Sequence, residues 1–223
     1  MNRTQMKSSR KKPSRFPDRI ESLPWNWIVT GSYAVVMGVI SFTMWPVGGY
    51  GVETDAFAGY LPDAAKLLNG SFTTLDGFKG PGYHIAVAAV GLIVRDLFLA
   101  AKLIAIVSAS AVLLLTFRLV RAFLGAKAAW ITFAVIATNA QFALYTIQVG
   151  TDVYFLALAV AAGYFILDRP GVSRTRHVRR AFIAGAIGGL AYLTRYNGLF
   201  LLLGGTIVYL LADWKETPEY SET

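Results

Sequence analysis

The chain has 223 residues, of which 55% are hydrophobic and 15% are charged, and its formal net charge is +8. A mean hydropathy of +0.51 argues against a soluble globular domain and leaves room for several membrane spans of about 20 residues each. The complete lack of cysteine excludes disulfides and thiolate metal sites. Basic clusters beside apolar segments favour lipid contacts and a topology signal over nucleic-acid binding.

Residues 1–24 are polar and basic and predict a disordered cytoplasmic tail. Its cationic residues are Arg3, Lys7, Arg10, Lys11, Lys12, Arg15 and Arg19. This segment is too long and too basic for a signal peptide. The apolar run from Trp25 to Trp45 is therefore predicted to be an uncleaved first span, with tryptophans as interfacial anchors at both ends.

A polar loop, predicted at residues 46–96, follows this span and faces outward if the basic tail stays inside. Its central stretch, Val52 to His84, contains a short amphipathic run that ends at Asn69-Gly70, and then a Gly-Pro-Gly corner. The acidic residues of this stretch are Glu53, Asp55, Asp63 and Asp76. We expect juxtamembrane helices here, and we expect any chemistry to take place here.

The apolar run from Tyr83 to Val94 is too short for an ordinary span. If it crossed the membrane, the basic residues around Arg118 and the cluster from Arg169 to Arg180 would both lie outside, against the positive-inside rule. If it lies on the outer surface, both clusters fall inside. The second arrangement predicts six crossings, at 25–45, 97–117, 128–147, 150–167, 181–193 and 199–212.

The expected fold is therefore an all-α integral membrane protein. Residues 25–212 form the transmembrane domain, and residues 213–223 form a short acidic cytoplasmic tail. This topology brings five ionisable residues to the same outward face although they lie far apart in the sequence: Asp55, Lys79, His84, Asp152 and Arg195.

Four motifs occur in order along the chain: E-T-D-A-F-A-G-Y-L-P-D-A-A-K-L-L-N-G, F-K-G-P-G-Y-H, V-G-T-D-V-Y-F and G-G-L-A-Y-L-T-R-Y-N-G. With these motifs, residues 25–212 resemble the N-terminal part of GT-C glycosyltransferases. The most similar group is the protein mannosyltransferases and aminoarabinose transferases, which use polyprenyl-phosphate sugars. Family members usually carry a carboxylate pair in the first motif, whereas here Ala56 follows Asp55 and Glu53 lies two residues before it. Members are also usually longer, so a truncated, inactive fragment is an open alternative.

The resemblance implies that Asp55 is the catalytic base of an inverting transfer and that Asp152 lines the active-site cavity. It also implies that Lys79 and Arg195 hold the donor phosphate. Three of these residues have a simpler interpretation as well: a helix cap for Asp55, a charge at a helix N-terminus for Asp152, and a headgroup contact for Lys79. The further substrate-binding candidates are Lys102, which could instead snorkel to the headgroups, and His84, Glu53 and Tyr83.

Aromatic residues of the loop could form a wall for a sugar ring or an interfacial belt. They are Tyr50, Phe57, Tyr60, Phe72, Phe78 and Tyr83. No cofactor is required by the sequence, and a divalent cation stays open. The expected partners are a polyprenyl-phosphate-sugar donor, membrane lipids and an unidentified glycan, lipid or protein acceptor, with no nucleic acid. The expected location is a prokaryotic plasma membrane. A non-catalytic protein, either a small transporter or a lipid-binding assembly subunit, is the alternative.

Overall fold

The computed structural model describes residues 24–44, 55–71, 79–167 and 174–211. Every regular element in these ranges is helical, and no strand occurs within them. The elements are α2 (Trp25–Thr43), the π-helical turn η1 (Ala56–Tyr60), α3 (Leu61–Leu68), α4 (Gly82–Val94), α5 (Leu97–Ala137), α6 (Ala140–Ile147), α7 (Asp152–Ile166), α8 (Arg174–Thr194) and α9 (Gly198–Leu211). The predicted all-α class is confirmed.

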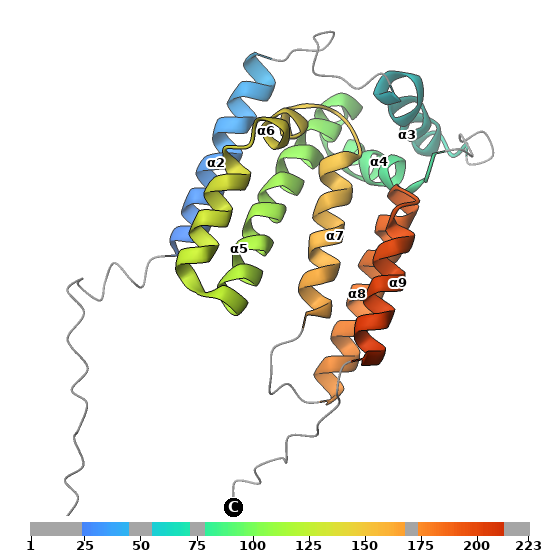
Figure 1. The fold of residues 1–223 in the computed structure, drawn as a ribbon. Coiled ribbons are helices and arrows are strands. Elements are labelled where there is room, and N and C mark those ends of the chain that lie inside the picture. Colours follow the sequence, from blue (N-terminus) through green and yellow to red (C-terminus); the bar gives the residue numbers. More distant parts are fainter. Residues whose placement is uncertain (1–23, 45–54, 72–78, 168–173, 212–223) are drawn as a thin grey trace, which may run out of the picture.

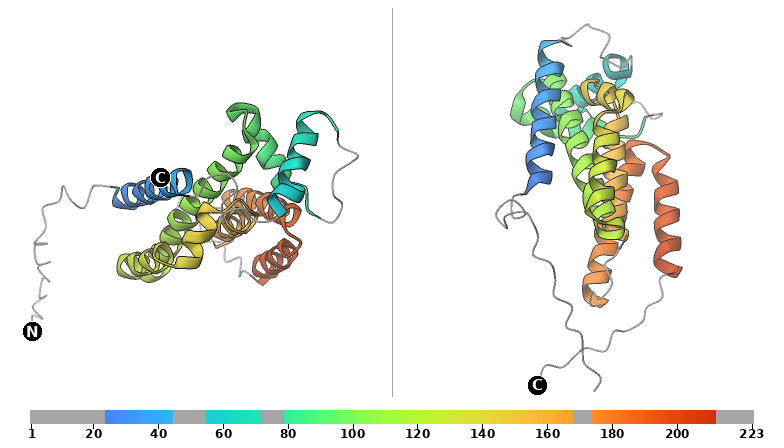
Figure 2. Two further views of the ribbon diagram at one scale, coloured as in Figure 1. Left: turned by 90° about the horizontal axis from the view of Figure 1, so that it is seen from above. Right: turned by 60° about the vertical axis from the view of Figure 1, so that its left-hand side comes forward.

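Most of the helices run lengthwise through one bundle, as Figures 1 and 2 show. The turn η1 and helices α3 and α4 gather at one end of this bundle, which we call the α3–α4 end (Figure 1). The opposite end holds the turn of α5 at Gly125, the end of α7 and the beginning of α8 (Figure 1). We call it the arginine end, because Arg179 and Arg180 lie on the first turns of α8.

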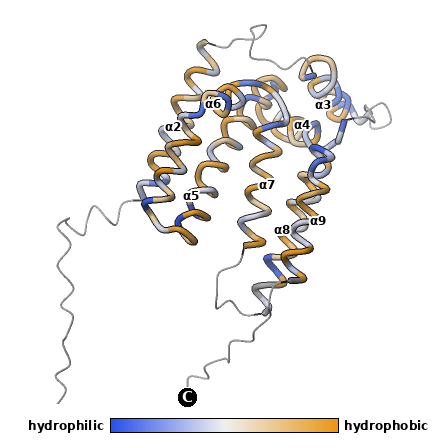
Figure 3. The backbone as a smooth tube through the Cα atoms, viewed as in Figure 1, coloured by the Kyte–Doolittle hydropathy of each residue, from blue (hydrophilic) through white to orange (hydrophobic). Residues whose placement is uncertain are grey.

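The lengthwise helices are mainly apolar, and hydrophilic residues concentrate toward the two ends of the bundle (Figure 3). Two described helices, α2 and α5, are long and apolar enough to cross a membrane, and Gly82–Val94, Asp152–Ile166 and Gly198–Leu210 are shorter apolar helices. This distribution suits a protein whose middle section lies in lipid. The number of crossings stays a prediction.

Helix α5 is in fact a hairpin of two helices. At Gly125 the backbone has φ 85° and ψ 174°, which is not helical, and a positive φ of this size favours glycine. Phe117 before the turn packs against Trp130 and Phe133 after it, with ring centroids 4.7 and 6.4 Å apart. The two halves therefore lie side by side, as predicted for the spans at 97–117 and 128–147.

The predicted span at 128–147 is interrupted at its middle. Helix α5 stops at Ala137, and the side chain of Asn139 accepts a hydrogen bond of 2.9 Å from the amide of Phe142 at the start of α6. This cap favours a new helix over continuation of the old one. The predicted single span is thus a longer helix followed by the short helix α6.

Helix α4 lies across the α3–α4 end rather than along the bundle; Figure 1 shows it nearly along its axis. It ends at Arg95, which has the left-handed φ of 63°. Asp96 then starts α5, and its carboxylate accepts a 2.9 Å hydrogen bond from the amide of Leu99. This sharp corner agrees with the interpretation of residues 83–94 as a surface segment. Their position relative to a bilayer stays a prediction.

A core of small and branched residues holds η1, α3 and α4 onto the first turns of α5. Ala56, Ala64, Ala100 and Ala101 are fully buried in it. Alanine at these contacts lets the helix backbones approach closely, as small residues do between membrane helices. The backbone next to Asp55 is consequently packed against the protein interior.

Candidate functional site

Asp55 stands directly before η1, and its carboxylate is 51% exposed. The ammonium of Lys79 donates to Oδ1 of Asp55 over 3.2 Å. Asp55 makes no side-chain capping hydrogen bond to the helix that follows. In this structure the carboxylate therefore forms an ion pair with a residue 24 positions later and does not cap the helix. About half of the side-chain surface of Asp55 stays exposed.

A second ion pair joins Asp152 to Arg195. Asp152 is the first residue of α7, and Arg195 directly follows the last residue of α8. The guanidinium of Arg195 donates to Oδ1 of Asp152 and, over 3.3 Å, to the hydroxyl of Thr151. Asp152 also complements the N-terminal dipole of α7. The carboxylate thus has both the simple role expected from its position and a cationic partner.

Three tyrosines pack together beside the Asp55–Lys79 pair. The ring of Tyr83 meets that of Tyr60 edge-on at 5.2 Å and that of Tyr154 at 5.7 Å. The ammonium of Lys79 lies 4.9 Å from the centre of the Tyr60 ring, a distance at which a cation is attracted to the ring face. Tyr154 was not among the residues predicted from the sequence, although it stands two residues after Asp152 in the V-G-T-D-V-Y-F motif.

The Gly-Pro-Gly corner packs on the end of α8 and brings the two cations to the same region. A Cβ atom added to Gly82 would lie 2.7 Å from Oγ1 of Thr194 and 2.9 Å from the carbonyl carbon of Leu193. A Cβ atom added to Gly80 would come closer still to the carbonyl oxygen of Leu193. Any larger residue would push the corner away from α8. Two of the sequence motifs, K-G-P-G and L-T-R, are therefore in direct contact.

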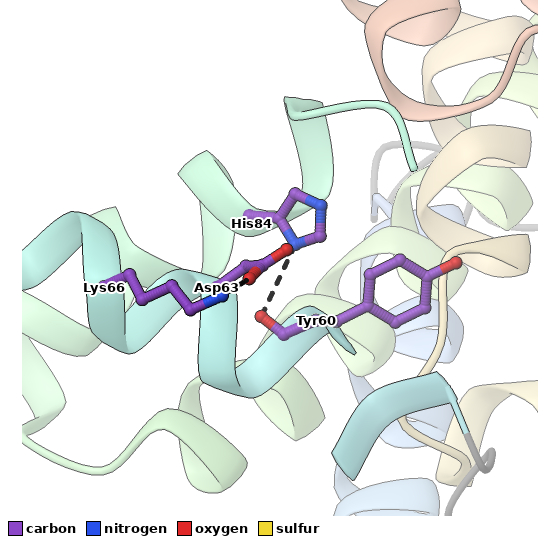
Figure 4. A network of polar contacts seen from close by, with 4 residues as sticks. All are labelled: Tyr60, Asp63, Lys66 and His84. Carbon is purple, nitrogen blue, oxygen red and sulfur yellow. Dashed lines mark hydrogen bonds and ion pairs between the residues drawn. The ribbon is translucent and has the colours of Figure 1, made fainter. Parts of the chain in front are cut away.

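A network of polar contacts joins Tyr60, Asp63, Lys66 and His84, of which Asp63 and His84 are buried (Figure 4). Nδ1 of His84 is 3.5 Å from the carbonyl oxygen of Tyr60, and Lys66 donates to Asp63 over 2.7 Å. His84 is only 1% exposed, so in this structure it lies inside the protein. Sequence reasoning did not select Asp63 as a site residue. No local signal in the sequence marks this carboxylate as buried.

Lys102 lies apart from the two ion pairs. It is 4% exposed, and its ammonium donates to the carbonyl of Ser41 near the end of α2. The rings of Phe42 and Phe98 flank it at 5.4 and 5.1 Å. The side chain thus points into the protein and does not snorkel away from it. Its predicted contact with a donor phosphate stays untested.

Several predicted residues lie outside the described ranges, and these are Glu53, Tyr50, Phe72 and Phe78. Of the other aromatic candidates, Phe57 stacks on Phe98 at 6.0 Å. Within the described part of the chain, no group of three or more His, Asp or Glu residues could hold a metal ion. The question of a divalent cation therefore stays open.

The family model described as "Dolichyl-phosphate-mannose-protein mannosyltransferase" matches residues 79–219. No curated protein and no solved structure matches the chain. The matched segment begins at Lys79 and includes Asp152 and Arg195, whereas Asp55 precedes it. Since this segment covers more than half of the sequence, the chain belongs to the dolichyl-phosphate-mannose-protein mannosyltransferase family and is a membrane glycosyltransferase of the GT-C type.

Proposed function

We propose that this protein transfers a sugar from a polyprenyl-phosphate carrier to an acceptor, with inversion at the anomeric carbon and Asp55 as the base. One observation carries the proposal: two carboxylate–cation pairs, Asp55–Lys79 and Asp152–Arg195, flank three contacting tyrosines at one end of the bundle. Such a convergence of charges from distant parts of a membrane protein is typical of a functional site.

In this reaction the acceptor heteroatom attacks the anomeric carbon from the side opposite the phosphate. The bond from this carbon to the phosphate oxygen breaks, and the polyprenyl phosphate leaves with the bonding electrons. The acceptor gives its proton to the Asp55 carboxylate, which is half-exposed and so within reach of a ligand. A positioned carboxylate base contributes about 10²–10⁴-fold to such a step.

Lys79 and Arg195 supply positive charge for the leaving phosphate. Each is held by a carboxylate in the structure, which fixes the position of the cation before a donor arrives. An oxyanion that gains charge during the reaction is stabilised strongly by cations that are already in place. Tyr60 lies under Lys79 and is the ring we propose for contact with the sugar, and the buried Tyr83 supports it.

The α3–α4 end is proposed to face the outer side of the membrane. The support is the positive-inside rule, since Arg118, Arg121, Lys127 and the arginines at the beginning of α8 belong to the opposite end of the bundle. An outward site matches the expected use of a lipid-linked donor instead of a soluble nucleotide sugar.

The test is Asp55→Asn in purified, membrane-reconstituted protein supplied with a panel of polyprenyl-phosphate sugars that includes the mannose form. Release of polyprenyl phosphate in the presence of acceptor candidates is measured. We expect a loss of about 10²-fold or more, because the amide cannot take the proton. Folding is checked by the melting temperature.

The matched control is Asp96→Asn. Asp96 lies in the same predicted loop, and asparagine can still cap α5, so activity should be unchanged. Unimpaired transfer by Asp55→Asn would remove Asp55 as the base. A wild-type chain without activity toward any donor would favour the inactive-fragment alternative.

A further inference from the structure

A groove of about 420 Å³ lies between α7, α8 and α9. Its lining is mainly apolar and includes Phe165, Ile166, Ala184, Leu201 and Leu202. The lining residues belong to the last turns of α7, to α8 from Arg180 to Gly188 and to α9 from Leu201 to Tyr209, and Phe123 near the turn of α5 joins them. The groove is therefore displaced toward the arginine end, away from the Asp55 and Asp152 ion pairs.

Arg180 lies in the wall of this groove. Its guanidinium donates to the carbonyl of Tyr164 over 3.0 Å and to that of Phe165 over 3.5 Å. These carbonyls belong to the last turn of α7, where a cation is favourable. The neighbouring Arg179 is exposed. It lines a separate surface hollow with Thr175, Val178 and Phe182, so Arg180 is the cation that stands in the wall of the apolar groove.

The size of the groove restricts its occupant. On one side Gly188 lies against Leu202, and on the other Gly205 lies against Ile166, and a Cβ atom added to either glycine would come within 2.7 Å of these side chains. The helices are thus already in close contact, and a further helix about 10 Å in diameter does not fit between them. A single hydrocarbon chain does, and the volume lies within the usual range for small-molecule sites, about 300–1,000 Å³.

From the apolar lining and the arginine in its wall, we infer that the groove binds one acyl chain of an anionic phospholipid whose phosphate contacts Arg180. Guanidinium groups bind phosphate through charge-assisted hydrogen bonds. Arginines at a membrane surface also attract anionic lipid. This site lies at the other end of the bundle from the proposed transfer site and takes a lipid that is not the sugar donor.

The first test measures lipids that stay bound to the protein. The chain is reconstituted into nanodiscs of phosphatidylcholine with added phosphatidylglycerol, and the co-purifying lipid is quantified by native mass spectrometry. We expect enrichment of phosphatidylglycerol over its share in the nanodisc. Arg180→Gln should reduce this enrichment about tenfold, the effect expected for the loss of a charged hydrogen bond. Arg179→Gln, which removes a charge from another face of α8, is the matched control and should leave the enrichment nearly unchanged.

A pair of glycine variants distinguishes lipid binding in the groove from general attraction of anionic lipid to positive charge. A Cβ atom at Gly185, in the groove, or at Gly189, outside it, would meet nothing within 4 Å. Gly185→Leu should therefore fill the groove and lower phosphatidylglycerol retention, whereas Gly189→Leu should not. Equal retention in wild type, Arg180→Gln and Gly185→Leu would overturn the proposal.

The second test identifies the occupant directly. A photoreactive benzoylphenylalanine replaces Tyr209, which lines the groove, and the protein is irradiated in the same nanodiscs. A phosphatidylglycerol adduct supports the inference. An adduct with residues 212–223 of the chain itself, or with added undecaprenyl phosphate in preference to phosphatidylglycerol, would assign the groove to another occupant and overturn it.

Discussion

The two ends of the bundle use their charged residues in different ways. At the α3–α4 end, Lys66, Lys79 and Arg195 each form an ion pair with an aspartate. At the arginine end, Arg180 donates to backbone carbonyls, and Arg118 lies 5.0 Å from the ring of Trp27. Carbonyls and rings do not neutralise a cation, whereas carboxylates do.

This difference suits the α3–α4 end to chemistry and the arginine end to orienting the protein in the membrane. Paired carboxylates and cations supply both a base and a phosphate-binding group, as acid–base catalysis with an anionic leaving group needs. Arginines that contact carbonyls and rings suit an end of the molecule that meets anionic lipid, and the positive-inside rule favours the inner side for this end. The proposals on sugar transfer and on lipid binding therefore concern opposite ends.

The largest expected effect is in a labelling experiment that asks whether the two ends lie on opposite sides of the membrane. The natural chain has no cysteine, so single cysteines can be introduced without background. In intact cells, a membrane-impermeant maleimide should label Ser71→Cys, whereas Lys127→Cys and Thr175→Cys should react only after permeabilisation. All three positions are exposed in the structure.

The labelling also tests α4. If residues 83–94 crossed the membrane, Lys127→Cys would be on the same side as Ser71→Cys and would react in intact cells. That result would contradict the surface position of α4 and the contrast between the two ends. Labelling in permeabilised cells controls for the reactivity of each cysteine.

Next in size is the effect of Arg195→Gln on transfer. If Arg195 stabilises the leaving phosphate, its removal should lower kcat/KM about 10²–10³-fold, the usual loss for one group that binds the transition-state charge. The melting temperature should fall only slightly, since the Asp152–Arg195 pair is partly exposed and contributes little to stability.

Exchanging the charges of Asp152 and Arg195 distinguishes a role of the pair in catalysis from a role in connecting α7 and α8. The double variant with Asp152→Arg and Arg195→Asp can form the ion pair again between α7 and α8. If the pair only connects these helices, the exchange restores activity. If the guanidinium at position 195 contacts phosphate, the double variant stays inactive although it folds, and this is the result we expect.

A smaller effect is expected for Gly82→Ala, which disturbs the contact of the Gly-Pro-Gly corner with α8. The added methyl group would lie within 3 Å of the backbone at Leu193 and Thr194, and such overpacking costs about 1–3 kcal/mol. The melting temperature should decrease by about 2–4 °C per kcal/mol. Gly189→Ala, which has open space around the new atom, should leave it unchanged. Equal melting temperatures would mean that the corner does not depend on this contact.

Residues with strong local signals were predictable. The all-α class followed from apolar runs with helix-ending residues between them, and Asn69-Gly70 ends α3, with Gly70 at φ 73°. Asp55, Lys79, Asp152 and Arg195 could be selected from the motifs that resemble the GT-C family and from the predicted topology, and Arg195 also stands out as a charge between two apolar runs. Their pairing as Asp55–Lys79 and Asp152–Arg195 could not be derived, because it depends on how the Gly-Pro-Gly corner docks on α8.

Other features were invisible in the sequence for the same reason. Asp63 and His84 are buried in a polar network, and nothing local distinguishes a carboxylate that faces the protein from one that faces water. Tyr154 joins the tyrosine group through a contact across 71 positions from Tyr83. The interruption at Thr138 depends on an asparagine cap that competes with a favourable apolar run. Side-chain direction and tertiary contact decide each of these cases.

The smallest expected effect concerns Lys102, which connects the end of α2 to the beginning of α5. Its ammonium holds the carbonyl of Ser41, and Phe98, one turn earlier, stacks on Phe57 just after Asp55. The two ends of the segment that leads from α2 to Asp55 are therefore both attached to the first turns of α5. Lys102→Met keeps the apolar stem between Phe42 and Phe98 but loses the hydrogen bond.

We expect Lys102→Met to lower the free energy of unfolding by about 1 kcal/mol and to reduce kcat a few-fold without changing KM, because the base would be held less firmly while the phosphate-binding cations stay in place. Steady-state kinetics at several donor concentrations check this. A large rise in KM instead would mean that Lys102 contacts the donor phosphate, as the sequence allowed. The phosphate-binding region would then extend from Arg195 to the end of α2, and the α3–α4 end would contain one wide cationic site in place of two compact ion pairs.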